Sequence, residues 1–305
     1  MKSPELIQAL KAAGEPSRLR MLLLCQSGEL TVGEITRILG QSQPRVSRHL
    51  KILCDARLLE RFRECHSVYY RVPANGPFSA LVAQLLASIA PDEAAIGKDA
   101  DNHRRVLEER VSRAGVEFGH DRSWMGSAGS AADEGRIRWA VLNLLGDSPV
   151  GRLLDVGTGS GRMLRLLGRR AGEAIGLDIS ARVLSGTRGV LHGAGLRHCT
   201  LRQGDMYALP FSGAAFDTVT FDEVLSVAER PDRALAEAAR VLKPGGRILI
   251  VDRVAGDRPG IDTGDLAAQL LHLGLQPLRS VPLQLAAATL VAMLVQLSDV
   301  RRPAA

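Results

Sequence analysis

The sequence lacks the long apolar runs that mark secretion or membrane insertion. Its first residues, Met1 to Glu5, carry no apolar segment of the kind found in a signal peptide, so we expect a cytoplasmic protein. The longest apolar stretch, residues 285–297, has 13 residues, whereas a membrane-spanning helix needs roughly 20. We therefore expect a soluble protein without a membrane partner.

Cysteine is also scarce, and its copies are widely spaced. The chain has four cysteines: Cys25, Cys54, Cys65 and Cys199. No two of them have C-x-x-C spacing. This spacing excludes a disulfide framework and a zinc ribbon, and it fits a reducing compartment. We interpret the four as ordinary thiols.

The composition is that of folded domains. The chain has 305 residues, of which 46% are hydrophobic and 24% charged, and shows no internal repeat. Such a composition is neither disordered nor fibrous, and the length suits about two average domains. The net charge of +6 is uneven, because residues 1–75 carry +5 and the rest +1. We expect the basic first quarter to bind a polyanion.

The hydrophobic pattern divides the chain near residue 91. Residues 77–90 predict an apolar helix with Leu81, Leu85 and Leu86 on one face, whereas residues 91–104 lose this periodicity and are assigned to a linker. A charged helix is expected over residues 105–120 and a loop over 123–133. From residue 136, helical and strand-like segments alternate, as is typical of a parallel sheet covered by helices. The expected domains are residues 1–90 and 133–299, joined by a linker and connecting helix over 91–132.

Residues 31–55 have the pattern of two helices joined by a tight turn. Thr31 and Glu34 form a capping box that opens a short helix, and Ser42 is a suitable N-cap for a second helix over residues 43–55. Apolar residues share one face of this second helix. Its other face is basic and carries amide and hydroxyl groups: Gln43, Arg45, Ser47, Arg48 and Lys51. The pattern is typical of a helix-turn-helix, whose second helix enters the major groove of DNA.

Residues 59–65 and 67–72 alternate like a hairpin, with Arg61, Arg63 and His66 near its tip. We interpret this hairpin as a wing lying over the sugar-phosphate backbone. On the helix, Arg and Gln can read base edges, whereas Ser, Lys and other Arg side chains hold phosphates. Periodicity alone fits a small helical domain with a solvated charged face equally well.

The string of residues 42–53, followed by residues 56–59 and 69–71, resembles the ArsR family of winged-helix repressors over residues 5–90. The resemblance implies a homodimer that is built on the first helix and on the helix near residues 77–90, and that reads two half-sites of a double-stranded DNA operator. It does not imply metal sensing. Thr-Val-Gly stands at residues 31–33 where metal-responsive members carry Cys-Val-Cys, and residues 77–90 have no His, Asp or Glu. Redox modulation through Cys54 or Cys65 is an alternative to their being incidental thiols.

Residues 153–164 combine a hydrophobic strand, a glycine turn and the start of a helix. Gly157, Gly159 and Gly161 follow G-x-G-x-G spacing rather than the dinucleotide spacing G-x-G-x-x-G, and Asp155 precedes them. Glycines let the backbone approach a ligand closely. An acid at the mouth of the loop suits a ligand with an ammonium group and would repel a pyrophosphate. This favours S-adenosylmethionine over NAD or FAD.

Further acids end the strands that follow. Asp178 ends an apolar strand 23 residues after Asp155 and can accept from both hydroxyls of a ribose. Asp205 follows a third strand-like segment and can accept from an adenine amino group. Residues 216–222 and 247–252 predict two more strands, the latter after a turn. Each acid alone is typical of a cap or turn, but their joint order at strand ends is typical of a ligand site in an open α/β sheet.

These motifs resemble the class I S-adenosylmethionine-dependent methyltransferases, particularly the methyltransferase type 11 group, over residues 133–297. The resemblance implies a Rossmann-like α/β domain whose seven-stranded sheet closes with an antiparallel pair at residues 275–283 and 289–297. It also implies that Asp155 and the glycine loop hold the methionine moiety and that Asp178 holds the ribose. Ile179 would then lie against the adenine, whose edge Asp205 and Met206 would bind. The matching positions are Asp155, Gly157, Thr158, Gly159, Gly161, Asp178, Ile179, Asp205 and Met206.

The side that would face a methyl acceptor departs from the family. Members that join an ArsR module to such a methyltransferase carry histidines and a glutamine after the fourth strand, and a Phe-Ala-Pro-His stretch with a helical insertion after the fifth. Residues 222–226 and 252–256 differ here, and the insertion is largely absent. Glu223 and Asp222 are candidates for a base that deprotonates the acceptor; alternatively, they are solvated loop carboxylates. No cysteine cluster lines these loops, which disfavours arsenite as the acceptor.

Two functions fit this sequence. The first is a transcriptional repressor that carries a working methyltransferase for an unknown acceptor. The second is a regulator that senses S-adenosylmethionine or S-adenosylhomocysteine without turnover. The altered acceptor loops favour sensing, whereas the family resemblance favours an enzyme.

Overall fold

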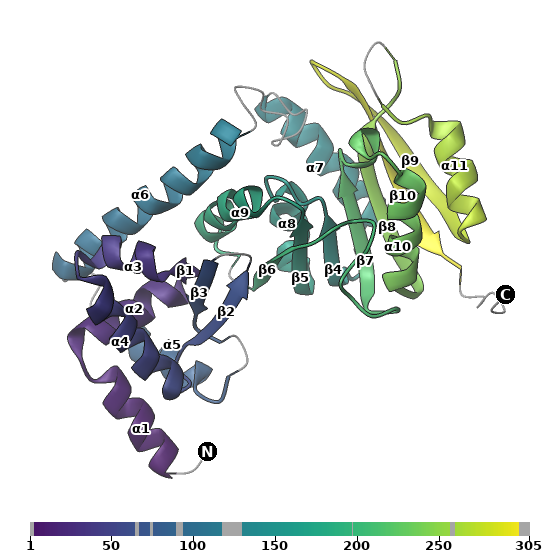
Figure 1. Cartoon of the computed structure of the whole chain (residues 1–305). Coiled ribbons are helices and arrows are strands. Elements are labelled where there is room, and N and C mark those ends of the chain that lie inside the picture. The colour runs from purple at the N-terminus through teal and green to yellow at the C-terminus, as the bar shows by residue number, and fades with distance from the viewer. Residues whose placement is uncertain are drawn as a thin grey trace. The chain divides into compact units, whose positions relative to one another are not determined.

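The computed structural model describes residues 3–64, 67–73, 76–89, 94–117, 130–196, 198–256 and 260–298. The chain divides into two compact units: residues 1–113 with 188–197, and residues 114–187 with 198–305. Figure 1 shows helices and a small sheet in the first unit and a seven-stranded sheet in the second. None of the described helices combines the length and apolar character that a membrane span requires. The expected boundaries at residues 90 and 133 stay predictions.

The first unit is mainly helical. Its elements are α1 (Ser3–Ala13), α2 (Pro16–Gln26), β1 (Leu30–Thr31), α3 (Val32–Leu39), α4 (Gln43–Asp55), β2 (Glu60–Glu64), β3 (Ser67–Arg71), α5 (Ser79–Ala87) and α6 (Ala94–Glu117). Strand β3 lies between β1 and β2 and is antiparallel to both. The helix-turn-helix and the hairpin are therefore confirmed. Strand β1 was not expected, because two residues are too few for a periodic signal.

The helix-turn-helix begins and ends where the sequence predicts. The Glu34 N–H donates to Thr31 Oγ1 at 3.3 Å, and the Thr31 N–H donates to the Glu34 carboxylate at 2.8 Å, which completes the capping box. Gly40 ends α3 at a φ of +64°, a left-handed conformation that glycine adopts at little cost. The buried face of α4 consists of Val46, Leu50 and Leu53.

Helix α5 packs the three expected leucines against the core of its unit. Leu86 is buried, and Leu81 and Leu85 are partly buried against the same cluster. Val82, which the expected set lacked, is also buried. Apolar residues lie on more than one side of this helix, so periodicity alone did not identify its most buried position.

The linker expected over residues 91–104 is wrong from residue 94 onward, because helix α6 begins at Ala94. Ion pairs hold its inward face. Asp99, 4% exposed, accepts two hydrogen bonds at 2.6 Å from Arg20, and Arg110 donates from Nε to Glu34 Oε1 at 2.7 Å. Charged side chains give no hydrophobic periodicity, so the pattern missed this part of the helix.

The second unit begins its described part with α7 (Ala131–Leu145), capped by the Ser130 side chain. The loop expected over 123–133 therefore ends by residue 130, and residues 118–129 lie outside the described residues. The main elements that follow are β4 (Gly151–Val156), α8 (Arg162–Leu167), β5 (Ala171–Asp178), α9 (Ala181–Gly193), β6 (Cys199–Gln203), β7 (Phe216–Asp222), α10 (Pro231–Val241), β8 (Leu242–Arg253), α11 (Thr263–His272), β9 (Leu275–Gln284) and β10 (Thr289–Leu297).

The large sheet has the strand order β6-β5-β4-β7-β8-β10-β9. Strands β4, β5, β6, β7 and β8 run parallel to one another, whereas β10 is antiparallel to both β8 and β9. This confirms the seven-stranded Rossmann-like sheet with its closing antiparallel pair. Strand β8 begins at Leu242, so the turn expected before residue 247 belongs to the strand.

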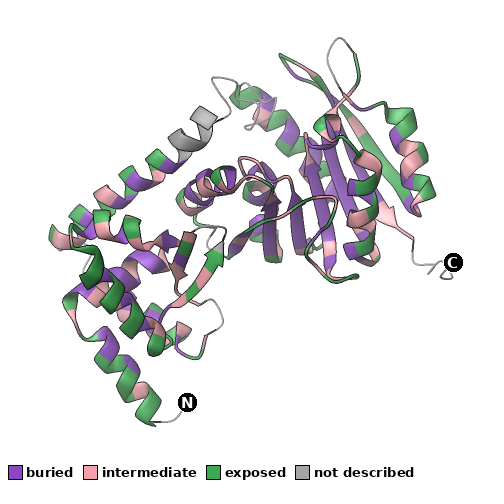
Figure 2. Ribbon diagram, viewed as in Figure 1, coloured by how far each residue is buried: buried purple, intermediate pink, exposed green. Residues whose placement is uncertain are grey.

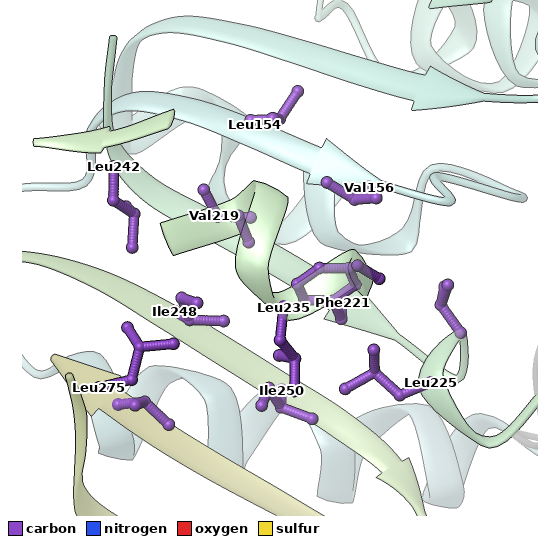
Figure 3. Packing of buried hydrophobic residues seen from close by; sticks show 14 of the residues in the cluster. Leu154, Val156, Val219, Phe221, Leu225, Leu235, Leu242, Ile248, Ile250 and Leu275 are labelled. Carbon is purple, nitrogen blue, oxygen red and sulfur yellow. The ribbon is translucent and has the colours of Figure 1, made fainter. Parts of the chain in front are cut away.

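The core of the second unit packs α10 and α11 against one face of the sheet. Figure 3 shows Leu154 of β4, Phe221 of β7, Ile250 of β8, Leu235 of α10 and Leu275 of β9 in this cluster. The first four are fully buried aliphatic or aromatic side chains from four elements. Their burial fixes the register of the parallel strands, and with it the edge at which all their carboxyl ends meet.

The polar contact between α2 and α6 can be tested by mutation. We expect Asp99→Ala to lower the free energy of unfolding by about 2 kcal/mol, because Arg20 would lose both hydrogen bonds while staying mostly buried. Asp101→Ala, on the exposed side of the same helix, should change it by less than about 0.5 kcal/mol. Urea unfolding followed by circular dichroism measures both, and equal losses would contradict a special role for the buried pair.

Candidate functional site

The point at which the strand order reverses lies at β4. This strand leads along the chain to β5 and β6 on one side, and the chain then returns to place β7 on its other side. In open α/β sheets, ligands bind outside the carboxyl ends of strands at such a point. The glycine loop follows β4 directly, so the fold brings it to the edge where ligands are expected.

The loop glycines adopt conformations that other residues avoid. Gly157, Gly159 and Gly161 have φ values of +66°, +50° and +75°. A Cβ on Gly157 would lie 2.5 Å from a methyl group of Val224, far inside van der Waals contact. The loop therefore requires glycine both for its backbone conformation and for its close approach to the segment after β7.

Asp155 lies beneath this loop rather than at its mouth, which corrects the expected position. Its side chain belongs to a residue that is 1% exposed, and both oxygens accept hydrogen bonds: Oδ2 from the Thr158 hydroxyl at 2.6 Å and Oδ1 from the Thr220 hydroxyl at 2.7 Å. Burial raises the pKa of Asp155 to about 7, although the hydroxyl bonds oppose this shift. Its observed contacts join the loop to β7.

Asp178 lies at the carboxyl end of β5 beside the loop. Its Oδ2 accepts from the Gly159 N–H at 3.1 Å, and its Oδ1 accepts from the Ser180 N–H at 3.0 Å. Burial raises the pKa of this carboxyl, while these backbone bonds act to lower it. Each oxygen retains lone-pair capacity for another donor. Ile179, the next residue, is 71% exposed and offers an apolar surface at the same edge.

The third predicted position lies next to the second. The Gly204 N–H donates to the Asp178 carbonyl at 3.0 Å, which places the end of β6 against the end of β5. Asp205 is exposed and accepts from the Tyr207 N–H at 2.8 Å, whereas Met206 is partly buried against the core. The structure thus gathers the predicted cofactor positions along one edge of the sheet, and their roles stay predictions.

The two candidate bases are not solvated, so that alternative interpretation is wrong. The Asp222 side chain is 11% exposed and that of Glu223 is 5% exposed. Both accept hydrogen bonds from Arg162, and Glu223 also accepts from Arg253. Burial raises the pKa of Asp222 and Arg162 opposes this shift. All four carboxylate oxygens of these two residues already accept from guanidinium groups, and their role as catalytic bases stays a prediction.

Sequence reasoning missed the partners of this segment. The sequence placed Arg162 at the start of a helix and Asp252 at the end of a strand, and it indicated no partner for either residue. Asp252 is fully buried, and its Oδ2 accepts from the backbone N–H groups of Leu225 and Ser226 at 2.7 and 3.2 Å. The position of Arg162 directly after the last loop glycine was the available signal, but sequence could not reveal its burial.

Helix α4 presents the predicted DNA-binding face to solvent, and Figure 2 colours its exposed residues green. The exposed members are Ser42, Gln43, Arg45, Ser47, Arg48 and Lys51. Ser42 occupies the N-cap position, but its side chain makes no capping hydrogen bond. Arg45 extends toward the start of α2, where its Nη2 donates to Ser17 Oγ at 3.4 Å. A continuous basic face next to a buried apolar face matches a recognition helix.

Strands β2 and β3 form the predicted wing. Arg63 is exposed on β2 opposite Val68, while His66 and Cys65 lie outside the described residues. The other three cysteines are free thiols, and burial raises the pKa of each: Cys25, Cys54 and Cys199. A raised pKa lowers the thiolate fraction and hence reactivity, which supports their interpretation as ordinary thiols.

Models of two protein families match separate parts of the chain. Residues 15–61 match the model of the arsR family of bacterial regulatory proteins, and residues 154–250 match that of a methyltransferase domain. The chain joins an arsR-family helix-turn-helix domain to a methyltransferase domain. The two matched ranges contain the recognition helix and the glycine loop, respectively.

Individual relatives are methyltransferases. A phosphatidylethanolamine N-methyltransferase of Cereibacter sphaeroides is 36% identical over 144 residues, 47% of this chain and 66% of that protein. A ubiquinone/menaquinone biosynthesis C-methyltransferase of Ruegeria sp. (strain TM1040) is 35% identical over 116 residues, 37% of this chain and 46% of that protein. The chain thus spans about half to two thirds of the length of such relatives.

A solved structure shows the same fold. The SAM-dependent methyltransferase from Aquifex aeolicus is 18% identical and has a TM-score of 0.50, covering 57% of this chain and 97% of that protein. At this identity the likeness extends to the fold of the methyltransferase domain.

The raised pKa of Asp155 predicts how stability depends on pH. Because this pKa is about 7 in the folded state and near 3.8 when unfolded, the folded protein holds an extra proton between these values. The resulting stabilisation is complete below about pH 4 and is lost as pH rises through 7. We expect the thermal midpoint of the native protein, relative to Asp155→Asn, to fall on the order of 5 °C between pH 5 and 8.

The comparison with Asp155→Asn removes contributions from all other titrating groups, since both proteins share them. Scanning calorimetry at several pH values measures the difference. A pH-independent difference between the two proteins would show that Asp155 ionises normally.

Proposed function

We propose that this protein is a DNA-binding transcriptional repressor whose methyltransferase domain uses S-adenosylmethionine to methylate an acceptor. The observation that carries the enzymatic part is the glycine loop at the sheet's switch point, with its N–H at Gly159 bonded to the carboxylate of Asp178. The observation that carries the regulatory part is the exposed basic face of α4. The relatives named above support methyl transfer without identifying the acceptor.

The chemistry of the site fits the cofactor. The three glycines of the loop carry no side chains, so backbone can lie directly against a methionine moiety. Asp178 would accept from the ribose hydroxyls, Ile179 would pack against the adenine, and Asp205 with Met206 would read the adenine edge. S-adenosylmethionine supplies an activated methyl group when bound. The protein's own part is to orient it and to exclude water.

The charge distribution supports a nucleic-acid partner for the first domain only. Residues 1–75 carry +5 of the net charge of +6. On α4, Gln43, Arg45 and Arg48 would reach base edges, while Ser42, Ser47 and Lys51, with Arg63 and His66 of the wing, would hold phosphates. Phosphate contacts supply affinity that falls with salt, and base contacts supply sequence preference.

The first helix supports a homodimer. Ile7 and Leu10 of α1 are 52% and 44% exposed, although α1 also buries Ala9, Ala12 and Ala13 against its own domain. An apolar surface on the far side of this helix suits packing against a second copy. A dimer would present two recognition helices to the two half-sites of an operator.

Cofactor binding can be tested at Asp178. We expect Asp178→Ala to weaken binding of S-adenosylhomocysteine by about 100-fold or more, because two hydrogen bonds to a charged group would be lost. Glu173→Ala, at the other end of the same strand, should bind normally. Isothermal titration calorimetry gives both dissociation constants, and native-like affinity in Asp178→Ala would show that the ligand lies elsewhere.

DNA binding can be tested at Arg45 and Arg48. We expect Arg45→Ala and Arg48→Ala each to weaken binding to the protein's own upstream DNA by about tenfold at fixed salt, because each removes a contact to a base or phosphate. Arg138→Ala, an exposed arginine of α7, is the matched control. Fluorescence anisotropy measures the affinities. If both variants bind like the native protein, α4 is not the recognition helix.

A further inference from the structure

Arg162 is a buried cation at the edge of the candidate cofactor site. It begins α8 directly after Gly161, and its side chain is 2% exposed. A guanidinium so deeply buried requires opposite charges and hydrogen-bond acceptors around it, since it cannot lose its proton. None of the roles considered so far uses this residue, so its partners indicate what it does.

The hydrogen-bond partners of Arg162 are Asp222, which ends β7, and Glu223, which follows it; a third acid, Glu134, lies 3.9 Å from its Nη1. Its Nε donates to Asp222 Oδ2 at 2.7 Å, and its Nη2 bonds both to the other Asp222 oxygen and to Glu223 Oε1, the latter at 2.9 Å. The interaction with Asp222 is bidentate, which fixes the orientation of the two side chains as well as their distance. Arg253 donates from its Nε to Glu223 Oε2 at 3.0 Å, so each carboxylate oxygen of Glu223 contacts a guanidinium.

The backbone at Glu223 is held in an unusual conformation. Its φ is +56°, in the left-handed region that residues with a Cβ rarely adopt. Such a conformation persists only where the surroundings determine it. Here the surroundings are the two guanidinium groups on the side chain and a hydrogen bond from the Glu223 N–H to the Val251 carbonyl at 2.7 Å.

The residues that follow are fixed from two sides. Val224 lies against Gly157 of the glycine loop, at a distance that leaves no room for a Cβ there. Asp252 of β8 accepts from the N–H groups of Leu225 and Ser226. Residues 222–226 are therefore held from two sides. Arg162 and the Val224–Gly157 contact connect them to the glycine loop and the start of α8, and Asp252 connects them to the end of β8.

We propose that Arg162 is a positioning residue for methyl transfer, which acts through Asp222 and Glu223 to hold residues 222–226 in a fixed geometry against the glycine loop. This inference rests on the proposed methyltransferase function. Transfer of a methyl group needs in-line placement of donor and acceptor, and small displacements cost large factors in rate. Arg162 links the segment on the acceptor side to the loop on the cofactor side, and the two carboxylates serve as its anchors.

A charge-removal cycle on the full-length protein tests this role. Isothermal titration calorimetry with S-adenosylhomocysteine compares the native protein with R162Q, D222N/E223Q and the triple variant R162Q/D222N/E223Q. We expect R162Q and D222N/E223Q each to bind about tenfold more weakly, because each leaves buried charge without its partner and releases the segment. The triple variant should recover to within about threefold of native affinity, because Arg162, Asp222 and Glu223 are then all replaced by neutral amides.

Hydrogen exchange supplies a readout that a general loss of stability would not move. At a temperature where all variants are folded by circular dichroism, deuterium uptake over residues 219–230 should rise in R162Q and return toward the native level in the triple variant, while uptake over β9 and β10 stays native. R162K, which keeps the charge but loses the bidentate interaction, should bind S-adenosylhomocysteine with an affinity between those of the native protein and R162Q. R152Q breaks an Arg–Glu pair at the opposite end of β4 and should bind like the native protein.

Three outcomes overturn the inference. These are native affinity in R162Q, a triple variant that binds no better than R162Q, and exchange that rises equally throughout the domain. The second would mean that Arg162 contacts the cofactor itself. Failure of the proposed cofactor site is distinguishable, because then the native protein itself would show no binding of S-adenosylhomocysteine.

Discussion

The buried carboxylate of Asp155 organises the methyltransferase domain. It lies one residue before the end of β4, where the strand order reverses, and the hydroxyls of Thr158 and Thr220 donate to its two oxygens. A buried carboxyl is costly unless its oxygens are bonded, so these donors must stay in place. One of them belongs to the glycine loop and the other to β7. The loop's conformation, its contact with Asp178 and its closeness to Val224 all depend on this anchor.

Buried ion pairs, rather than apolar contacts, set the geometry near both functional surfaces. In the first domain Asp99 holds α6 against α2, and Arg110 holds it against α3. In the second, Arg162 and Arg253 hold the end of β7. Such pairs add little net stability, because removing charge from water costs nearly as much as the pairing returns. Their value is directional, since hydrogen bonds fix angles as well as distances.

The two domains divide the chemistry between them. The first carries nearly all of the net charge, and three of its cations, Arg45, Arg48 and Lys51, lie on an exposed helix face that suits a polyanion. The second is almost neutral overall, and it concentrates acids at the carboxyl ends of parallel strands, where a ligand with hydroxyl and amino groups can donate to them. The two charge environments are incompatible at one surface, because acids that suit such a ligand would repel the phosphates of DNA.

The sequence by itself determined the parts of this protein that depend on near neighbours. The capping box at Thr31 and Glu34, the buried apolar face of α4 and the strand that leads into the glycine loop were predicted correctly, since each signal lies within a short stretch of the chain. Tertiary structure alone decided the rest. The partners of Arg162 and Asp99 lie 60 and 79 residues away in the chain, and charged side chains leave no periodic trace of burial. That Asp155 lies beneath its loop, and that α6 begins at Ala94, follow from contacts which only the folded chain creates.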